Sequence, residues 1–201
     1  MSRQAIEQHI ATLAAGQVFT PKSLHGHGSR TNIDQVLSRL VKAGAIKREA
    51  RGLYQKPITS RFTGKPLPAQ LNQVLEMIAQ NNHEVIAPHG AVALNQFGLS
   101  TQNQLRPVFY TTGRSRKIKV GHQEVELRHV NPKRLPLGNS KAGLALTAMR
   151  YIGKKELEPK MVKQIRQQLE PADWQQVQAV RLTQPEWLIR LLEATTEANH
   201  V

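Results

Sequence analysis

The sequence predicts an α+β protein, with an N-terminal winged helix-turn-helix followed by a mixed α/β C-terminal domain that ends in a helical bundle. Three observations lead to this fold class. An apolar pattern with helical spacing over Ser29–Ala43 runs directly into a short basic hairpin. Strand and helix patterns then alternate between residues 69 and 130. From Ser140 onward, the remaining patterns are all helical.

The segment Ser29–Tyr54 carries the winged-helix prediction. Ser29 is a suitable N-cap, because its hydroxyl can accept a free backbone N–H of the first turn. Gly44 is expected to end the helix, since glycine adopts the left-handed conformation without steric cost. The apolar residues at three- and four-residue steps are Ile33, Val36, Leu37, Leu40 and Val41. Strands are expected at 45–48 and 53–56, joined through residues 49–52.

The residues before this helix complete the expected motif. A first helix is predicted over Ser2–Ala15, and a short strand at Val18–Phe19 is expected to pair with the wing. A second short helix is predicted over 20–24, with threonine as N-cap and proline in the first helical position. Residues 25–28, His-Gly-His-Gly, are predicted to form the turn between the helices. A metal site at these histidines is less favoured, because no third ligand is near them in sequence and two glycines suit a flexible turn.

The face of the 29–43 helix opposite its apolar stripe is polar. Asp34 is the only carboxylate of the helix and could cap the helix or pair locally. A solvated amphipathic helix is the alternative interpretation. Such a surface normally mixes Glu with Lys, so the lack of Glu favours contact with base edges or phosphates of DNA. The predicted DNA-binding residues are Arg30, Thr31, Asn32, Gln35, Ser38, Arg39, Lys42, Lys47, Arg48 and Arg51.

The composition favours a polyanionic partner. The chain of 201 residues has 28 Lys and Arg against 14 acids, a formal net charge of +14 and a pI near 10.6. Neutralising phosphates releases condensed counterions, which drives association with nucleic acid. A membrane surface is the competing partner, but no basic amphipathic helix with Trp or Phe on its apolar side is evident. The absence of a long apolar run, of a signal-peptide pattern and of cysteine leads us to expect a cytoplasmic protein without a membrane partner.

The stretch Pro57–Pro68 is rich in turn-forming residues and is predicted to be a linker. The predicted organisation is therefore a winged helix-turn-helix domain over 1–57, a linker over 58–68 and an α/β domain over 69–201. Its expected elements are a helix at 69–80, strands at 84–87 and 107–111, a short helix at 90–95, a hairpin of 117–120 with 124–130, and helices at 140–152, 158–169, 172–181 and 185–198.

The second domain has a basic hairpin of its own. Its cations are candidates for a nucleic-acid or partner contact, and the alternative is a solvated sheet edge whose lysines discourage edge pairing. These residues are Arg114, Arg116, Lys117, Lys119, Arg128, Lys133 and Arg134. The tripeptide Pro88-His89-Gly90 lies between a strand and a helix. It is too short to be a phosphate loop and is interpreted as a tight turn.

Nothing in the sequence indicates an enzyme. Acid–base and two-metal chemistry need converging carboxylates, but the only aspartates, Asp34 and Asp173, fall in unrelated helices. Glu124 and Glu126 share one face of a strand and are expected to form salt bridges with lysines of the hairpin. No catalytic residues, metal or cofactor are therefore predicted.

Blocks of the sequence resemble a known family. The segments VFTPKSL, SRTNIDQVLSRLVKAGAIKREARGLYQKP, APHGAVALNQFGLSTQ and TTGRSRKIKVG resemble the abortive-infection AbiE-type antitoxins and, more narrowly, the DUF6088 group. The resemblance extends from about Ser2 to Leu192. It implies a winged-helix domain that represses its own promoter through inverted repeats, and a second domain that neutralises a nucleotidyltransferase-like toxin encoded alongside.

The function expected from sequence is thus that of a DNA-binding transcriptional autorepressor. By resemblance, the protein is also the antitoxin of a type IV toxin–antitoxin or phage-defence system. Direct toxin binding stays open, because such antitoxins generally oppose the effect of the toxin without a stable complex. The alternative is a module that binds RNA or the toxin through the basic C-terminal domain.

Overall fold

The computed structural model describes residues 3–102 and 106–197. The chain is an α+β protein, as the sequence predicts, and it divides into two compact units. Unit 1 comprises Met1–Glu84 with Ile118–Val125, and unit 2 comprises Val85–Lys117 with Glu126–Val201. Ser2 and Ala198, the predicted outer ends of the first and last helices, lie outside the described residues.

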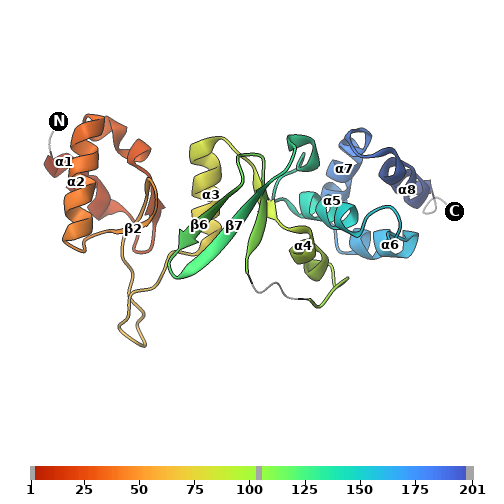
Figure 1. Cartoon of the computed structure of the whole chain (residues 1–201), viewed down its shortest axis with the longest axis horizontal. Coiled ribbons are helices and arrows are strands. Elements are labelled where there is room, and N and C mark those ends of the chain that lie inside the picture. Colours follow the sequence, from red (N-terminus) through yellow and green to blue (C-terminus); the bar gives the residue numbers. More distant parts are fainter. Residues whose placement is uncertain (1–2, 103–105, 198–201) are drawn as a thin grey trace. The chain divides into compact units, whose positions relative to one another are not determined.

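Unit 1 begins with a small helical core beside a three-stranded sheet (Figure 1). Ile6, Ile10 and Leu24 pack against the inner residues of helix α2 (Arg30–Lys42), which include Ile33 and Leu37. Because these side chains recur at helical spacing, each helix buries one side and leaves the other to solvent. The elements are α1 (Arg3–Thr12), β1 (Val18–Phe19), the 3₁₀ helix η1 (Pro21–His27), α2 (Arg30–Lys42), β2 (Lys47–Ala50), β3 (Leu53–Gln55) and α3 (Leu71–Asn82).

The sheet of unit 1 has the strand order β1-β3-β2, with both pairings antiparallel. The predicted pairing of Val18–Phe19 with the hairpin is confirmed, since Val18 lies opposite Gln55. Strand β2 was predicted two residues too early. The Ala45 and Ile46 amides still donate to the Leu40 carbonyl at the end of α2, so they cannot join the sheet.

The short segment before α2 also differs from the prediction. Instead of a helix over 20–24 and a separate turn, one 3₁₀ helix continues from Pro21 to His27. Thr20 precedes it but makes no capping hydrogen bond through its side chain. Pro21 and Leu24 are buried in this helix, and the His27 ring lies 4.6 Å from the His9 ring of α1. These contacts fix the segment as a 3₁₀ helix, whereas its two glycines predicted a flexible turn.

The predicted domain boundary at 58–68 differs from the division of the chain. Helix α3 contacts strands β1 and β3, so it belongs to unit 1 and not to the following α/β part. Strands β6 (Arg116–Val120) and β7 (Gln123–His129) form a hairpin, and its loop end, residues 118–125, also belongs to unit 1. Neither assignment could be read from turn-rich composition, because both depend on contacts between segments distant in sequence.

The second sheet has the order β4-β5-β7-β6. Strand β5 pairs antiparallel with β4 and parallel with β7, so the sheet is mixed. Gly121 turns the β6–β7 hairpin with a φ of 60°, a left-handed conformation that glycine adopts freely. The elements from β4 to η2 are β4 (Ile86–Pro88), α4 (Gly90–Gln96), β5 (Val108–Thr111), β6 (Arg116–Val120), β7 (Gln123–His129) and η2 (Pro132–Arg134).

The C-terminal part of unit 2 is helical. Helix α5 is buried along most of its length, from Ala142 to Met149, and packs against α4 and α7. Helices α6 and α8 pack against each other and contribute Ile165 and Leu192 to the same core. These elements are α5 (Lys141–Ile152), α6 (Pro159–Gln167), α7 (Pro171–Ala179), η3 (Arg181–Thr183) and α8 (Glu186–Glu197). No helix within the described ranges is both long and apolar enough to cross a bilayer.

Candidate nucleic-acid interface

Helix α2 is fixed by its caps and by its buried side. The Ser29 hydroxyl accepts a hydrogen bond from the Asn32 amide at 3.3 Å, as the sequence predicts for an N-cap. Gly44 follows the helix with a φ of 72°, which satisfies its expected role as the stop. Ile33 and Leu37 are fully buried beneath it. With both ends and the inner side determined, the outward side chains have one orientation relative to the core of unit 1.

The predicted contact residues of α2 lie at the surface. Asn32 is half-buried, and its side-chain amide approaches Gly28. The exposed members are Arg30, Thr31, Gln35, Ser38, Arg39 and Lys42, and the exposed members in the hairpin are Lys47, Arg48 and Arg51. The set therefore combines a polar helix surface with the cations of the β2–β3 hairpin.

A hollow of about 490 Å³ lies between α2 and the β2–β3 hairpin. It is lined by side chains of two successive elements, Ser38 and Lys42 from the helix and Arg48 and Arg51 from the hairpin. The hollow is lined by Pro21, Arg30, Asp34, Ser38, Val41, Lys42, Arg48, Arg51, Gly52 and Tyr54. Four cations and one carboxylate face it, so the local charge favours an anion such as a phosphate.

Two ion pairs restrain cations of this surface. The Arg30 Nε atom lies 2.9 Å from a carboxylate oxygen of Asp34 one turn later, which confirms the expected local pairing of Asp34. The Lys47 Nζ atom lies 2.8 Å from Oε1 of Glu49, whose side chain is fully buried. Arg30 is exposed and can exchange its partner for a phosphate, whereas Lys47 neutralises a buried charge and is less available.

The cations predicted in the second domain do not form one group. Lys119 falls in unit 1, whereas the other six belong to unit 2. Lys117 and Lys119 lie on one face of β6 and Arg116 lies on the other, because side chains alternate along a strand. The Nε atom of Arg128 donates to Glu126 at 2.7 Å, so this glutamate pairs within β7. The expected salt bridge of Glu126 to a lysine of the hairpin is replaced by this contact.

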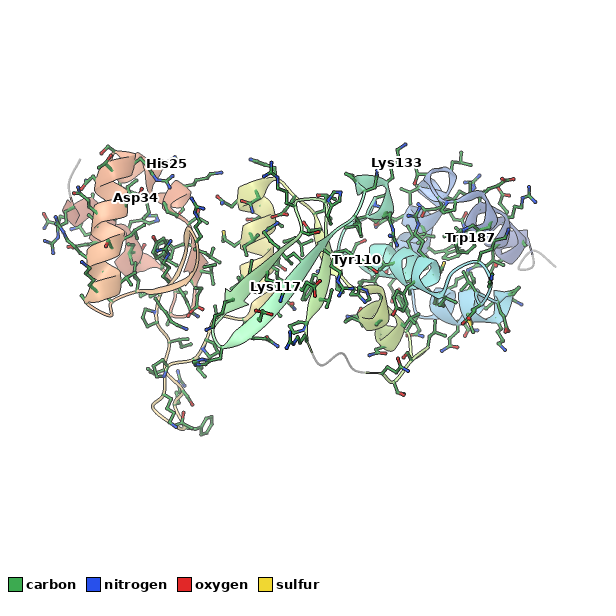
Figure 2. The ribbon with its side chains drawn as sticks, viewed as in Figure 1. His25, Asp34, Tyr110, Lys117, Lys133 and Trp187 are labelled. Atoms are coloured by element: carbon green, nitrogen blue, oxygen red, sulfur yellow. The ribbon has the colours of Figure 1, made fainter. Side chains whose placement is uncertain are left out.

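Unit 2 holds a cluster that the sequence did not predict, formed by His89, Tyr110, Tyr151 and Arg134. We call it the aromatic–arginine cluster. The His89 ring lies 4.8 Å from the Tyr110 ring and 5.1 Å from the Tyr151 ring. The Arg134 guanidinium lies 5.7 Å from the centre of the Tyr110 ring, within cation–π range. Tyr110 is marked on β5 in Figure 2. Two of the three tyrosines of the chain therefore meet at one histidine.

The backbone of this cluster is close-packed. The His89 Nδ1 atom accepts the Ala91 amide at 3.3 Å and so caps helix α4. A Cβ atom at Gly90 would lie 2.3 Å from the Tyr151 ring, so only glycine fits there. This close approach explains the glycine of Pro88-His89-Gly90, whose sequence alone predicted only a tight turn.

Burial and the surrounding arginines determine the protonation of the cluster. Burial, followed by Arg128, lowers the pKa of His89 below its ordinary value, so the imidazole is neutral at neutral pH. Burial raises the pKa of Tyr110, with Arg134 opposing the shift. Burial and Arg134 lower the pKa of Arg150, while the hydrogen bond from Arg128 lowers the pKa of Glu126. Neutral rings beside cations form a surface suited to bases and phosphates.

The described residues contain no group of three or more His, Asp or Glu side chains placed to hold a metal ion.

Comparison with known proteins gives one informative match. A family model described as "Family of unknown function (DUF6088)" matches residues 5–177. This range includes α2, the β2–β3 hairpin, the aromatic–arginine cluster and most of the helical part of unit 2. No curated protein matches the chain.

Proposed function

The chain belongs to the DUF6088 family, and we propose that it is a DNA-binding transcriptional autorepressor with a winged helix-turn-helix in its N-terminal part. We further propose that it is the antitoxin of a type IV, AbiE-like toxin–antitoxin or phage-defence system and opposes a nucleotidyltransferase-like toxin. The observation that carries the DNA-binding proposal is the hollow between α2 and the basic hairpin, which is lined by Ser38 and Lys42 together with Arg48 and Arg51.

In this proposal, α2 enters the major groove of the promoter. Thr31, Gln35 and Arg39 are exposed on α2 and can reach base edges, and half-buried Asn32 flanks them. The hairpin cations would bind the sugar–phosphate backbone beside the helix. Arg48 and Arg51 are assigned to phosphates or the minor groove, and Lys42 and Lys47 to the backbone, with Lys47 limited by its pairing to Glu49.

Repression of the native promoter tests this function in cells. A reporter fused to the DNA upstream of the gene should be repressed by the full chain and derepressed by Arg39→Ala. Lys163→Ala, a change of an exposed cation on α6, is the matched control and should leave repression intact. Equal reporter activity with and without the protein would overturn the autorepressor proposal.

The antitoxin role rests on the family resemblance. The nucleotidyltransferase-like toxin that this proposal expects to be encoded alongside should arrest growth when it is expressed alone. Co-expression of the full chain should restore growth. Type IV antagonism predicts rescue without a stable complex, so the two proteins should migrate separately in size-exclusion chromatography. Failure of the full chain to restore growth would contradict the antitoxin role and leave the DNA-binding proposal standing.

A second candidate function is RNA binding through unit 2, and the aromatic–arginine cluster favours it. Tyr151 is 45 % exposed beside His89, and Arg134 is exposed above Tyr110, so bases and phosphates could bind side by side. Titration with tRNA and with duplex DNA at matched ionic strength separates the candidates. Tighter binding of tRNA that is lost in Arg134→Gln would favour the RNA-binding function over the operator-binding one.

A further inference from the structure

The stretch between β3 and α3, predicted to be a linker, is held by its own hydrogen bonds as a narrow loop (Figure 1). Thr59 and Pro66 form an isolated antiparallel bridge across its base. The Leu67 amide donates to the Ile58 carbonyl at 2.8 Å, and the Ser60 amide to the Lys65 carbonyl at 2.9 Å. The two halves of the loop are thus paired, and the residues between them form a defined tip.

The tip is closed around Ser60. Its hydroxyl accepts the amides of Phe62 and Thr63 at 3.3 and 3.2 Å, and its carbonyl accepts the Gly64 amide at 2.9 Å. Gly64 has a φ of 65°, which lets the chain reverse direction there. These contacts fix the backbone on both sides of Phe62.

Phe62 is 100 % exposed, the highest value among the large hydrophobic residues of the described chain. Its ring leaves its whole apolar area in water, and no other described residue covers it. Arg61 precedes it and Lys65 follows, and the stretch from Pro57 to Pro68 contains no acidic residue. An aromatic tip between two cations matches a ligand that presents flat apolar surfaces beside negative charge.

We propose that this loop is a second DNA-contacting element, in which Phe62 inserts between base pairs from the minor groove. Arg61 and Lys65 bind the phosphates on either side. The inference deepens the proposed DNA-binding function and rests on it for the identity of the ligand. Architectural DNA-binding proteins use apolar wedges in this way, recovering the cost of unstacking one base step through added contacts along the bent duplex.

Charge and size favour DNA over the other surfaces that an exposed aromatic ring could meet. The loop belongs to the same compact unit as α2 and the basic hairpin, so one unit carries all the proposed contacts. An anionic membrane would also attract the two cations, but a single ring offers little apolar area for insertion into lipid. A duplex needs only one ring per base step.

Affinity for duplex DNA tests the inference. Phe62→Ala removes a side chain that packs against nothing, so folding is unaffected, and affinity for the upstream duplex should fall by about tenfold, the scale of one lost base stack. Leu182→Ala, at a residue 72 % exposed in η3, is the matched control and should bind like the wild type. Replacing Arg61 and Lys65 together by Gln should reduce the salt slope by about two.

Tryptophan fluorescence of the Phe62→Trp variant tests insertion directly. The emission that this variant adds to that of Trp174 and Trp187 should be quenched at saturating duplex, because the indole stacks on bases. Unchanged affinity in Phe62→Ala together with unquenched emission in Phe62→Trp would overturn the inference. Loss of binding to anionic phosphatidylglycerol vesicles in Phe62→Ala, with duplex binding intact, would assign the loop to a membrane instead.

The two proposals fail in different ways. Preference for the upstream duplex over a scrambled one, with Phe62→Ala equal to wild type, would overturn only the loop. An equal loss on both duplexes in Phe62→Ala, without any sequence preference in the wild type, would support the loop and overturn the repressor. Absence of binding to any duplex would overturn both.

Discussion

On the exposed side of α2, the Arg30 Nε atom lies 2.9 Å from a carboxylate oxygen of Asp34, which follows it by one turn. Asp34 is marked on this helix in Figure 2. The two side chains are 62 % and 50 % exposed, so their ion pair adds little to stability. Asp34 nevertheless faces the hollow that also contains Lys42, Arg48 and Arg51. The pair therefore matters for binding, because it places the single acidic residue of α2 beside the proposed phosphate site.

Asp34→Asn should strengthen binding to any duplex. Removing the carboxylate frees Arg30 and also removes the repulsion between the carboxylate and the DNA phosphates. The affinity for duplex DNA should therefore rise about two- to fivefold at low salt. The melting temperature should stay nearly constant, since an exposed i,i+4 pair is worth roughly 0.5 kcal/mol or less. Asp173→Asn changes the net charge equally but lies in α7 and serves as control. An equal gain in both variants, measured by fluorescence anisotropy, would show that only net charge matters.

Gln35→Ala should weaken sequence-specific binding. Gln35 is exposed opposite the buried side of α2, and loss of a base contact should cost roughly 1–3 kcal/mol on the upstream duplex. Binding to scrambled DNA should barely change, because phosphate contacts remain. Gln80→Ala, an exposed glutamine of α3, is the control. Equal losses on both duplexes would remove Gln35 from the base-contact residues.

Arg51→Ala should weaken binding to every duplex. Arg51 lies at the turn of the hairpin and lines the hollow, where it is expected to neutralise one phosphate. The slope of log K against log salt should therefore decrease by about one. Arg190→Ala, which removes an exposed arginine from α8, should leave the slope unchanged. A slope in Arg51→Ala equal to that of the wild type would exclude Arg51 from phosphate binding.

Gly90→Ala should destabilise unit 2. The added methyl group would lie 2.3 Å from the Tyr151 ring, and relieving such overpacking typically costs about 1–3 kcal/mol. Urea unfolding followed by circular dichroism measures the change. Gly26→Ala meets no atom within 4 Å and should be nearly neutral. A neutral result for Gly90→Ala would mean that Tyr151 moves away without cost.

Protonation of His89 should make stability depend on pH. Its folded-state pKa is lowered by burial and Arg128, so the unfolded chain binds the proton more tightly than the folded chain does. The contribution to stability is complete above the unfolded pKa of about 6.5 and is lost as the pH falls through the lower folded value. Below about pH 6.5, the free energy of unfolding of His89→Gln should depend less on pH than that of the wild type or of His122→Gln. Identical pH profiles for all three would contradict this assignment.

The local parts of the fold could be predicted from sequence because short-range interactions determine them. Helix α2, predicted over 29–43, spans Arg30–Lys42, because its apolar spacing lies within the helix and its cap and stop lie directly beside it. The predicted Val18–Phe19 strand is confirmed, and so is the predicted hairpin of 117–120 with 124–130, which turns at Gly121.

The parts that depend on distant contacts could not be predicted. Helix α3 contacts strands β1 and β3, so unit 1 extends beyond the domain boundary predicted at 58–68. His89, Tyr110 and Tyr151 come from three separate segments and carry no local pattern that would link them. The glycine after His89 was visible, but the reason for it, the Tyr151 ring, becomes evident only in three dimensions. The tip of the 57–68 loop depends on hydrogen bonds that turn-rich composition alone does not indicate.

Competitive gel-shift titration of the full chain against its own upstream DNA tests the central claim most directly. At about 150 mM salt, a sequence-specific repressor should bind this duplex at least about a thousandfold more tightly than a scrambled one, so the shift survives excess competitor. If the scrambled duplex displaces the protein at equal concentration, the charge of α2 and the hairpin serves only non-specific binding. That result would contradict autorepression.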